Sequence, residues 1–122
     1  PCQILLVEDN LVNQKIASMM LRKLGYECTI ASNGKEALSI IADASENPFT
    51  LIFMDMQMPI MDGVTATENI VKLYKDKAPP VIAMTANVLT EDKKKCFDAG
   101  MVDHVSKPIK IDELKRVIIS NC

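Results

Sequence analysis

Acidic residues stand directly after short apolar runs in this sequence. Glu8 and Asp9 follow the first such run, and Asp55 ends a later one. Thr85 and Lys107 stand at the ends of two further runs. If the runs are parallel strands, their carboxyl ends lie along one edge of a sheet, where open α/β proteins bind ligands. We therefore expect Glu8, Asp9 and Asp55 to converge in one crevice, flanked by Thr85 and Lys107.

Three carboxylates held close together repel one another, and a divalent cation is the simplest group that offsets this charge. An all-oxygen site with few protein ligands suits Mg²⁺, which keeps several of its waters. A carboxylate beside Mg²⁺, an ammonium and a hydroxyl can carry out phosphoryl transfer, with an aspartate as the nucleophile. Asp55 is the best candidate for the acceptor because it stands alone at its strand end. Glu8 and Asp9 are then left to bind the metal.

Alternating apolar runs and helical patterns indicate the elements that position these residues. Strands of a sheet covered on both faces are predicted at residues 4–7, 51–54 and 81–84, and weaker ones at 28–31 and 102–105. Helices are predicted over 11–24, 33–41, 63–74, 90–100 and 112–118. Val12, Ile16, Met20 and Leu24 form an i+4 stripe on the first helix. The alternation predicts an α/β, doubly wound, flavodoxin-like fold, with five helices around a five-stranded parallel sheet that we expect in the order 2-1-3-4-5.

The composition excludes several classes of function. The 122 residues fit a single domain, residues 1–122, and the net charge of −2 argues against a nucleic-acid partner. No apolar run approaches the roughly 18 residues of a membrane span, so we expect no membrane contact by this domain. Pro1 in place of an initiator Met indicates a processed chain or an excised fragment. Four widely spaced cysteines predict reduced thiols in a cytoplasmic protein: Cys2, Cys28, Cys96 and Cys122.

Five short motifs occur in order along almost the whole chain. Through them the sequence resembles the receiver domain of two-component response regulators, and most closely the receivers of hybrid histidine kinases in multistep phosphorelays. A location in the cytoplasmic part of a membrane-bound sensor kinase is compatible with this resemblance. The motifs are Val7-Glu8-Asp9-Asn10, Phe53-Met54-Asp55-Met56-Gln57-Met58-Pro59, Met61-Asp62-Gly63, Met84-Thr85-Ala86 and Ser106-Lys107-Pro108.

The resemblance implies specific roles for the acidic residues. Asp55 would accept a phosphoryl group from a phosphohistidine donor. The carboxylates of Asp9 and Asp55 and the backbone carbonyl of Gln57 would bind Mg²⁺, and Glu8 would contribute through a water. Such a domain is a phosphoacceptor whose own chemistry is limited to self-phosphorylation and autodephosphorylation.

The resemblance also implies roles for residues at the later strand ends. Thr85 would bind a phosphoryl oxygen once Asp55 is modified, and Lys107 would pair with the phosphate across a cis Lys107–Pro108 bond. Many family members carry Tyr or Phe three positions before this lysine, and that ring turns inward with the threonine. Here the position is His104, the only histidine. A rotamer switch is then either missing or run by an imidazole whose charge varies near neutral pH.

The expected partners are a histidine kinase or a histidine phosphotransfer protein. Leu11 and Val12, at the start of the first helix, are expected either to be exposed for docking a donor helix bundle or to be buried in the core. Gln57 and Asn87 lie beside the path of an attacking water and are expected to tune the lifetime of the phosphate. Neither is an acid that could activate the water, so we expect a moderately durable phosphate.

Three other functions share parts of this pattern. A phosphatase that forms an aspartyl phosphate usually has a second acid two residues after the nucleophile, where this chain has Gln57. A flavodoxin-like cofactor binder has a phosphate loop rich in Gly, Ser and Thr, whereas Glu8 and Asp9 would repel a phosphate. A degenerate receiver that acts only as a protein-binding scaffold is the third alternative, although all the acceptor residues are present.

Overall fold

The sheet of this protein is built from five parallel strands in the order β2-β1-β3-β4-β5. The computed structural model describes residues 2–43, 49–56, 63–74, 79–85, 94 and 97–121. The predicted sheet and its strand order are both confirmed. The strands are β1 (Ile4–Val7), β2 (Cys28–Ala31), β3 (Leu51–Asp55), β4 (Val81–Thr85) and β5 (Asp103–Ser106).

The three central strands are buried at every position, whereas the two edge strands are partly exposed. A strand covered by helices on both faces has no solvent side, so its residues read as an unbroken apolar run. The edge strands mix polar and apolar residues, which made them the weaker predictions. β5 starts at Asp103, one residue later than predicted.

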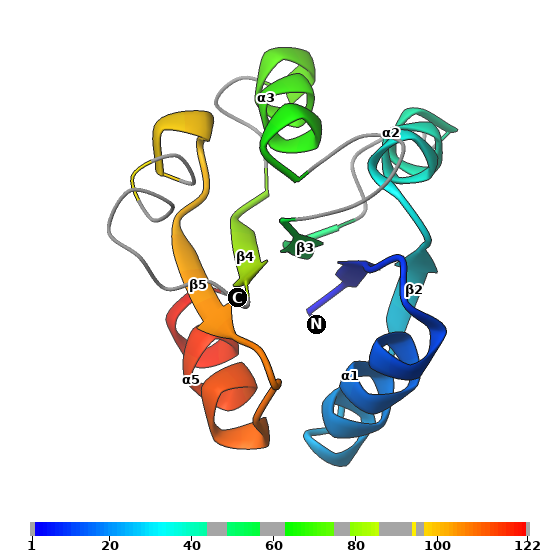
Figure 1. Cartoon of the computed structure of the whole chain (residues 1–122), viewed down its shortest axis with the longest axis vertical. Helices are drawn as coiled ribbons and strands as arrows, with labels where there is room; N and C mark the ends of the chain where they lie inside the picture. Colours follow the sequence, from blue (N-terminus) through cyan, green and yellow to red (C-terminus); the bar gives the residue numbers. More distant parts are fainter. Residues whose placement is uncertain are drawn as a thin grey trace.

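Helices cover both faces of the sheet, as Figure 1 shows. α1 (Leu11–Lys23) and α5 (Ile111–Asn121) contribute to the hydrophobic core on one face. α2 (Gly34–Asp43) and α3 (Gly63–Tyr74) contribute to the core on the other. Of the predicted helix at 90–100, residues 97–99 are helical and end at Gly100, whose φ is +112°, while 90–93, 95 and 96 lie outside the described residues. No helix in the described ranges is long and apolar enough to cross a membrane.

Capping residues fix where α1 begins and ends. The side chain of Asn10 accepts a hydrogen bond from the N–H of Asn13 at 3.0 Å, so the helix starts directly after the acidic pair that follows β1. At the other end Gly25 has a φ of +95°, a left-handed conformation that glycine adopts without steric cost. The N–H of Gly25 bonds to the carbonyl of Arg22 at 3.0 Å.

An ion pair joins α5 to the edge strand β5. Arg116 Nη1 lies 3.0 Å from Asp103 Oδ2, and its Nη2 donates to the main-chain carbonyl of His104 at 3.2 Å. The N–H of His104 donates to Asp103 Oδ1 at 2.8 Å. Hydrogen bonds to Glu113 and Asp103 raise the pKa of Arg116, so the guanidinium stays charged.

The cysteines depart in part from the expectation of reduced thiols. Cys2 is disulfide-bonded, so the prediction is wrong at this position. Cys28 is a free thiol in β2, and burial raises its pKa. Cys96 and Cys122 lie outside the described residues.

Candidate functional site

Three carboxylates converge at the carboxyl ends of β1 and β3. These strands are neighbours in the sheet, so Glu8 and Asp9, which follow β1, lie next to Asp55, which ends β3. One carboxylate oxygen from each residue lies within 4.8 Å of the others. Glu8 and Asp55 are only 2% and 3% exposed, whereas Asp9 is exposed. The predicted convergence of the three acids is therefore present in the structure.

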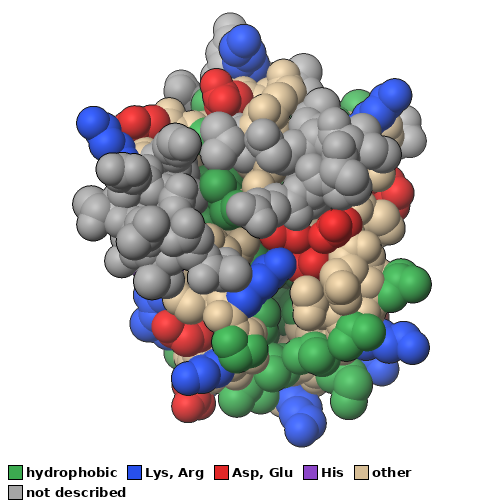
Figure 2. Space-filling model, in the orientation of Figure 1, with side chains coloured by type: hydrophobic (Ala, Val, Ile, Leu, Met, Phe, Trp, Pro, Cys, Tyr) green, Lys and Arg blue, Asp and Glu red, His purple; other side chains and the backbone are tan. Residues whose placement is uncertain are grey.

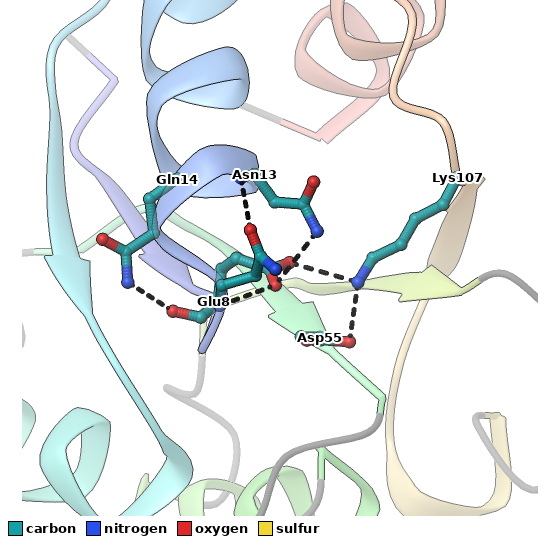
Figure 3. A network of polar contacts seen from close by, with 6 residues as sticks. Glu8, Asn13, Gln14, Asp55 and Lys107 are labelled. Atoms are coloured by element: carbon teal, nitrogen blue, oxygen red, sulfur yellow. Dashed lines mark hydrogen bonds and ion pairs between the residues drawn. The ribbon is translucent and has the colours of Figure 1, made fainter.

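Lys107 provides a positive charge between two of these acids, as Figure 3 shows. Its Nζ lies 3.1 Å from Asp55 Oδ1 and 3.2 Å from Glu8 Oε2. Burial by itself lowers the pKa of Lys107, but the charges and hydrogen bonds of Asp55 and Glu8 outweigh that effect, so the pKa is raised overall. The side chain is therefore a permanent ammonium at neutral pH. The bond from Lys107 to Pro108 is cis, as expected.

Thr85 and Gly63 complete the surroundings of Asp55. Thr85 ends β4, which pairs with β3, and it is 7% exposed at the same edge of the sheet. The N–H of Lys107 donates to the Thr85 carbonyl at 2.8 Å, which joins the carboxyl end of β4 to that of β5. A Cβ at Gly63 would overlap the main-chain oxygen of Asp55, so a larger residue there would displace the end of β3.

Glu8 is held by several donors that the sequence did not single out. Its Oε1 accepts from the main-chain N–H of Asn10 at 3.2 Å and from Asn13 Nδ2 at 3.5 Å. Its main-chain carbonyl accepts from Gln14 Nε2 at 2.6 Å. Because the other carboxylate oxygen contacts Lys107, the Glu8 side chain is fixed from both sides. The sequence held one indication of this role for Gln14. It stands three positions before Ala17, and that spacing places both residues on the same, buried face of α1.

The stripe predicted on α1 faces solvent in its first half. Val12 is 63% exposed and Ile16 is 42% exposed, while Gln14, Ala17 and Leu21 face the core. Of the two alternatives for the start of the helix, exposure is therefore the correct one. We define the α1 apolar surface as its four exposed large hydrophobic residues, which are Leu11, Val12, Ile16 and Met19.

A groove of about 380 Å³ lies between α1 and the segment after β5. Its lining combines apolar side chains with one amide and the ammonium that contacts Asp55. Figure 2 shows the acidic side chains with a basic one beside them, and hydrophobic side chains gathered below them on the α1 and α5 side. The lining residues are Asn13, Ile16, Lys107, Pro108 and Ile109.

His104 lies in β5 and is half-buried. Val105 packs in the core under α1 and α5, so by strand alternation His104 points to the opposite face of the sheet. Its Nδ1 is buried and has no hydrogen-bond partner within the part of the chain that the structure describes. A switch role for His104 stays a prediction. Gln57 and Asn87, expected to bind metal or tune the phosphate lifetime, lie outside the described residues.

The fold and the acidic site belong to a known family. The family model of the response regulator receiver domain matches residues 4–119, and the chain is a member of that family. Histidine protein kinase 1 of Candida albicans is 41% identical over 125 residues, covering 97% of this chain and 5% of the kinase. The chain spans between 5% and 12% of the length of such curated relatives.

Two solved structures resemble this one over nearly the whole chain. The receiver domain of the sensor histidine kinase PA1611 from Pseudomonas aeruginosa, which has magnesium in its active-site cleft, gives a TM-score of 0.87 at 39% identity. The match covers 98% of this chain and 96% of that one. The Saccharomyces cerevisiae receiver domain of Ssk1, in complex with the histidine phosphotransfer protein Ypd1, gives 0.89 at 31% identity. Here the coverage is 98% of this chain and 88% of the other.

Proposed function

We propose that residues 1–122 act as one phosphoaccepting receiver domain in a cytoplasmic phosphorelay, with Asp55 as the acceptor. The observation that carries the proposal is the contact of Asp55 Oδ1 with the Lys107 ammonium beside two further carboxylates. In the proposed reaction an Asp55 carboxylate oxygen attacks the phosphorus of a phosphohistidine. The P–N bond breaks and an acyl phosphate forms. Transfer to a histidine of a phosphotransfer protein reverses these bond changes.

The donor set fits a hard divalent cation. Three carboxylates, two of them almost fully buried, present oxygens within 4.8 Å, and one ammonium alone does not balance their charge. We propose Asp9, Asp55 and the backbone carbonyl of Gln57 as direct ligands. Glu8 would act through a water, because its two oxygens are already engaged by Lys107, Asn10 and Asn13. When bound, Mg²⁺ would neutralise charge on the transferring phosphoryl oxygens.

Lys107 and Thr85 act on the phosphoryl group from the side of β4 and β5. Once Asp55 carries a phosphate, its Oδ1 is no longer a free carboxylate oxygen, and the Lys107 ammonium can pair with the phosphate instead. The Thr85 hydroxyl can donate to a second phosphoryl oxygen, because Thr85 lies at the same sheet edge as Asp55. These two residues therefore stabilise the modified form.

We further propose that the donor and the acceptor protein dock on the α1 apolar surface. This surface adjoins the groove that contains Lys107, so a helix lying on it can present a histidine to Asp55. Exposed apolar side chains gathered on one helix face are typical of a protein interaction site. The complex of a related receiver with a histidine phosphotransfer protein supports this choice of partner.

The test is to incubate the protein with Mg²⁺ and a small acyl-phosphate donor and to measure its intact mass. We expect one added phosphoryl group, none without a divalent cation and none on Asp55→Asn. Modification that survives Asp55→Asn contradicts the site. Repeated turnover of unrelated phosphomonoesters favours the phosphatase alternative. Binding of a phosphotransfer protein without any phosphorylation of Asp55 favours the scaffold alternative.

A further inference from the structure

One buried polar side chain beside the carboxylate cluster takes no part in the proposed phosphoryl transfer. Gln14 lies in the first turns of α1 and is 7% exposed. Its Nε2 donates a 2.6 Å hydrogen bond to the main-chain carbonyl of Glu8, as Figure 3 shows. Buried polar side chains are almost always paired, and here the pairing is with the turn that carries the acids.

The carbonyl that Gln14 holds belongs to the peptide unit between Glu8 and Asp9. The N–H of Glu8 donates to the carbonyl of Ala31 in β2 at 3.0 Å. The sheet therefore fixes one side of the Glu8 main chain, and Gln14 fixes the other. Because a peptide unit is planar, holding its carbonyl sets the position of the Asp9 Cα, the point from which the exposed Asp9 side chain extends.

Gln14 is itself held rigidly. Its main-chain N–H donates to the carbonyl of Asn10 at 2.9 Å, and its side chain lies on the buried face of α1. The Glu8 side chain has independent partners, which are Lys107 and the main-chain N–H of Asn10. Loss of the Gln14 amide would therefore release the Glu8–Asp9 peptide without releasing the Glu8 carboxylate.

We propose that Gln14 is a positioning residue that orients the Asp9 carboxylate for the cation. This inference rests on the proposed function, in which Asp9 is a direct Mg²⁺ ligand. It places the effect of Gln14 on Mg²⁺ affinity and not on the phosphorylation rate once the cation is bound. Groups that orient a metal ligand without touching the metal change its affinity by about 10- to 100-fold when they are removed.

The test uses Gln14→Met, which keeps the length and the apolar packing of the side chain but removes the donor. The Mg²⁺ dissociation constant is measured by titration calorimetry on unphosphorylated protein. The phosphorylation rate is then measured at saturating Mg²⁺ with a small acyl-phosphate donor. We expect a dissociation constant about tenfold higher and an unchanged saturated rate. Gln14→Leu carries the same expectation and serves if circular dichroism shows that Gln14→Met is unfolded.

A matched control is Tyr74→Phe, which removes a side-chain donor to the main-chain carbonyl of Ile41 at 3.0 Å, between α3 and α2. We expect it to keep wild-type Mg²⁺ affinity. An unchanged affinity in the folded Gln14 variants overturns the proposal, as does an equal rise in Tyr74→Phe or a slower saturated rate with normal affinity. The affinity is measured without a phosphoryl donor. Mg²⁺ binding without phosphorylation of the wild type would therefore contradict the proposed function and not the role of Gln14.

Discussion

The Nζ of Lys107 lies 3.1 Å from Oδ1 of Asp55, although the two residues are 52 positions apart in the sequence. The same ammonium lies 3.2 Å from Oε2 of Glu8. One side chain therefore holds together two buried acids from two neighbouring strands. We expect three properties to depend on this contact: the stability of the metal-free protein, the change of that stability at alkaline pH, and the reactivity of Asp55.

Removing the ammonium should destabilise the metal-free protein. Lys107→Met leaves two buried carboxylates without a counter-ion, which costs about 3–5 kcal/mol for a fully buried pair. Because the Lys107 side chain is 23% exposed, we expect a smaller loss, about 2 kcal/mol. Urea unfolding without divalent cations measures this loss, and Lys35→Met, at an exposed position in α2, is the control. Equal losses in the two variants would contradict the prediction.

The contribution of Lys107 to stability should disappear only at alkaline pH. The pKa of Lys107 is raised above its usual value of 10.5 in the folded state, so with Asp55 and Glu8 ionised the ammonium stabilises the fold from neutral pH up to that value. The stabilisation is lost as the pH rises through the folded-state pKa. We expect the difference in unfolding free energy between wild type and Lys107→Met to be constant from neutral to mildly alkaline pH. It should shrink beyond 10.5. A difference in unfolding free energy that already declines near neutral pH would contradict this prediction.

Gly63→Ala should displace the acceptor. The added Cβ would overlap the Asp55 main-chain oxygen, and overpacking of this kind costs about 1–3 kcal/mol. A shift of a reacting group by about 1 Å can slow a reaction on the order of 100-fold, so we expect markedly slower phosphorylation by a small donor. Gly25→Ala is the control, since its Cβ meets nothing within 4 Å although its φ is +95°. It should lose about 1 kcal/mol of stability and keep its phosphorylation rate.

Asp9→Asn should remove the response of stability to Mg²⁺. A ligand present at about 100 times its dissociation constant stabilises the folded state by about 2.7 kcal/mol. We expect the thermal unfolding temperature of the wild type to rise when Mg²⁺ is added. The unfolding temperature of Asp9→Asn should rise much less at the same Mg²⁺ concentration. Sodium chloride at equal ionic strength separates binding from screening. An identical Mg²⁺ response in both proteins would rule out Asp9 as a ligand.

Val12→Glu should weaken docking without changing the chemistry at Asp55. Val12 is 63% exposed on the α1 apolar surface, and a charge there removes apolar contact with a partner. We expect about tenfold or greater loss of affinity for a histidine phosphotransfer protein, with unchanged phosphorylation by a small donor. Ile119→Glu, at a 70% exposed apolar position in α5, is the control. Surface plasmon resonance compares the two variants, and equal losses would count against the α1 surface.

The site could be predicted because its residues stand at the ends of strands. An apolar run defines a strand, and the parallel arrangement brings residues such as Asp9 and Asp55 to one edge. The neighbour relation of β1 and β3, on which this depends, is confirmed. The contacts of Lys107 with both Glu8 and Asp55 could not be predicted from the spacing of these residues in the sequence. They depend on the conformation that a long, flexible side chain adopts between two strand ends.

The rotation of α1 could not be predicted from its apolar pattern. Val12 and Ile16 form part of a regular stripe, yet they face solvent, while Gln14 is buried. The helix satisfies the carbonyl of Glu8 by turning this amide inward. Periodicity measures where apolar residues recur and not which buried polar group needs a donor. An apolar stripe that a helix leaves exposed to solvent therefore looks like a core face in the sequence.

The ion pair between Asp103 and Arg116 has a consequence for association of the sheet. β5 is an edge strand, and an open edge is a template on which another chain can extend the sheet. At His104 the main-chain N–H is bonded to the Asp103 carboxylate and the carbonyl to the Arg116 guanidinium. A foreign strand would have to displace both charged groups to pair there. The Asp103–Arg116 ion pair therefore protects this edge of the sheet against pairing with a strand of another chain.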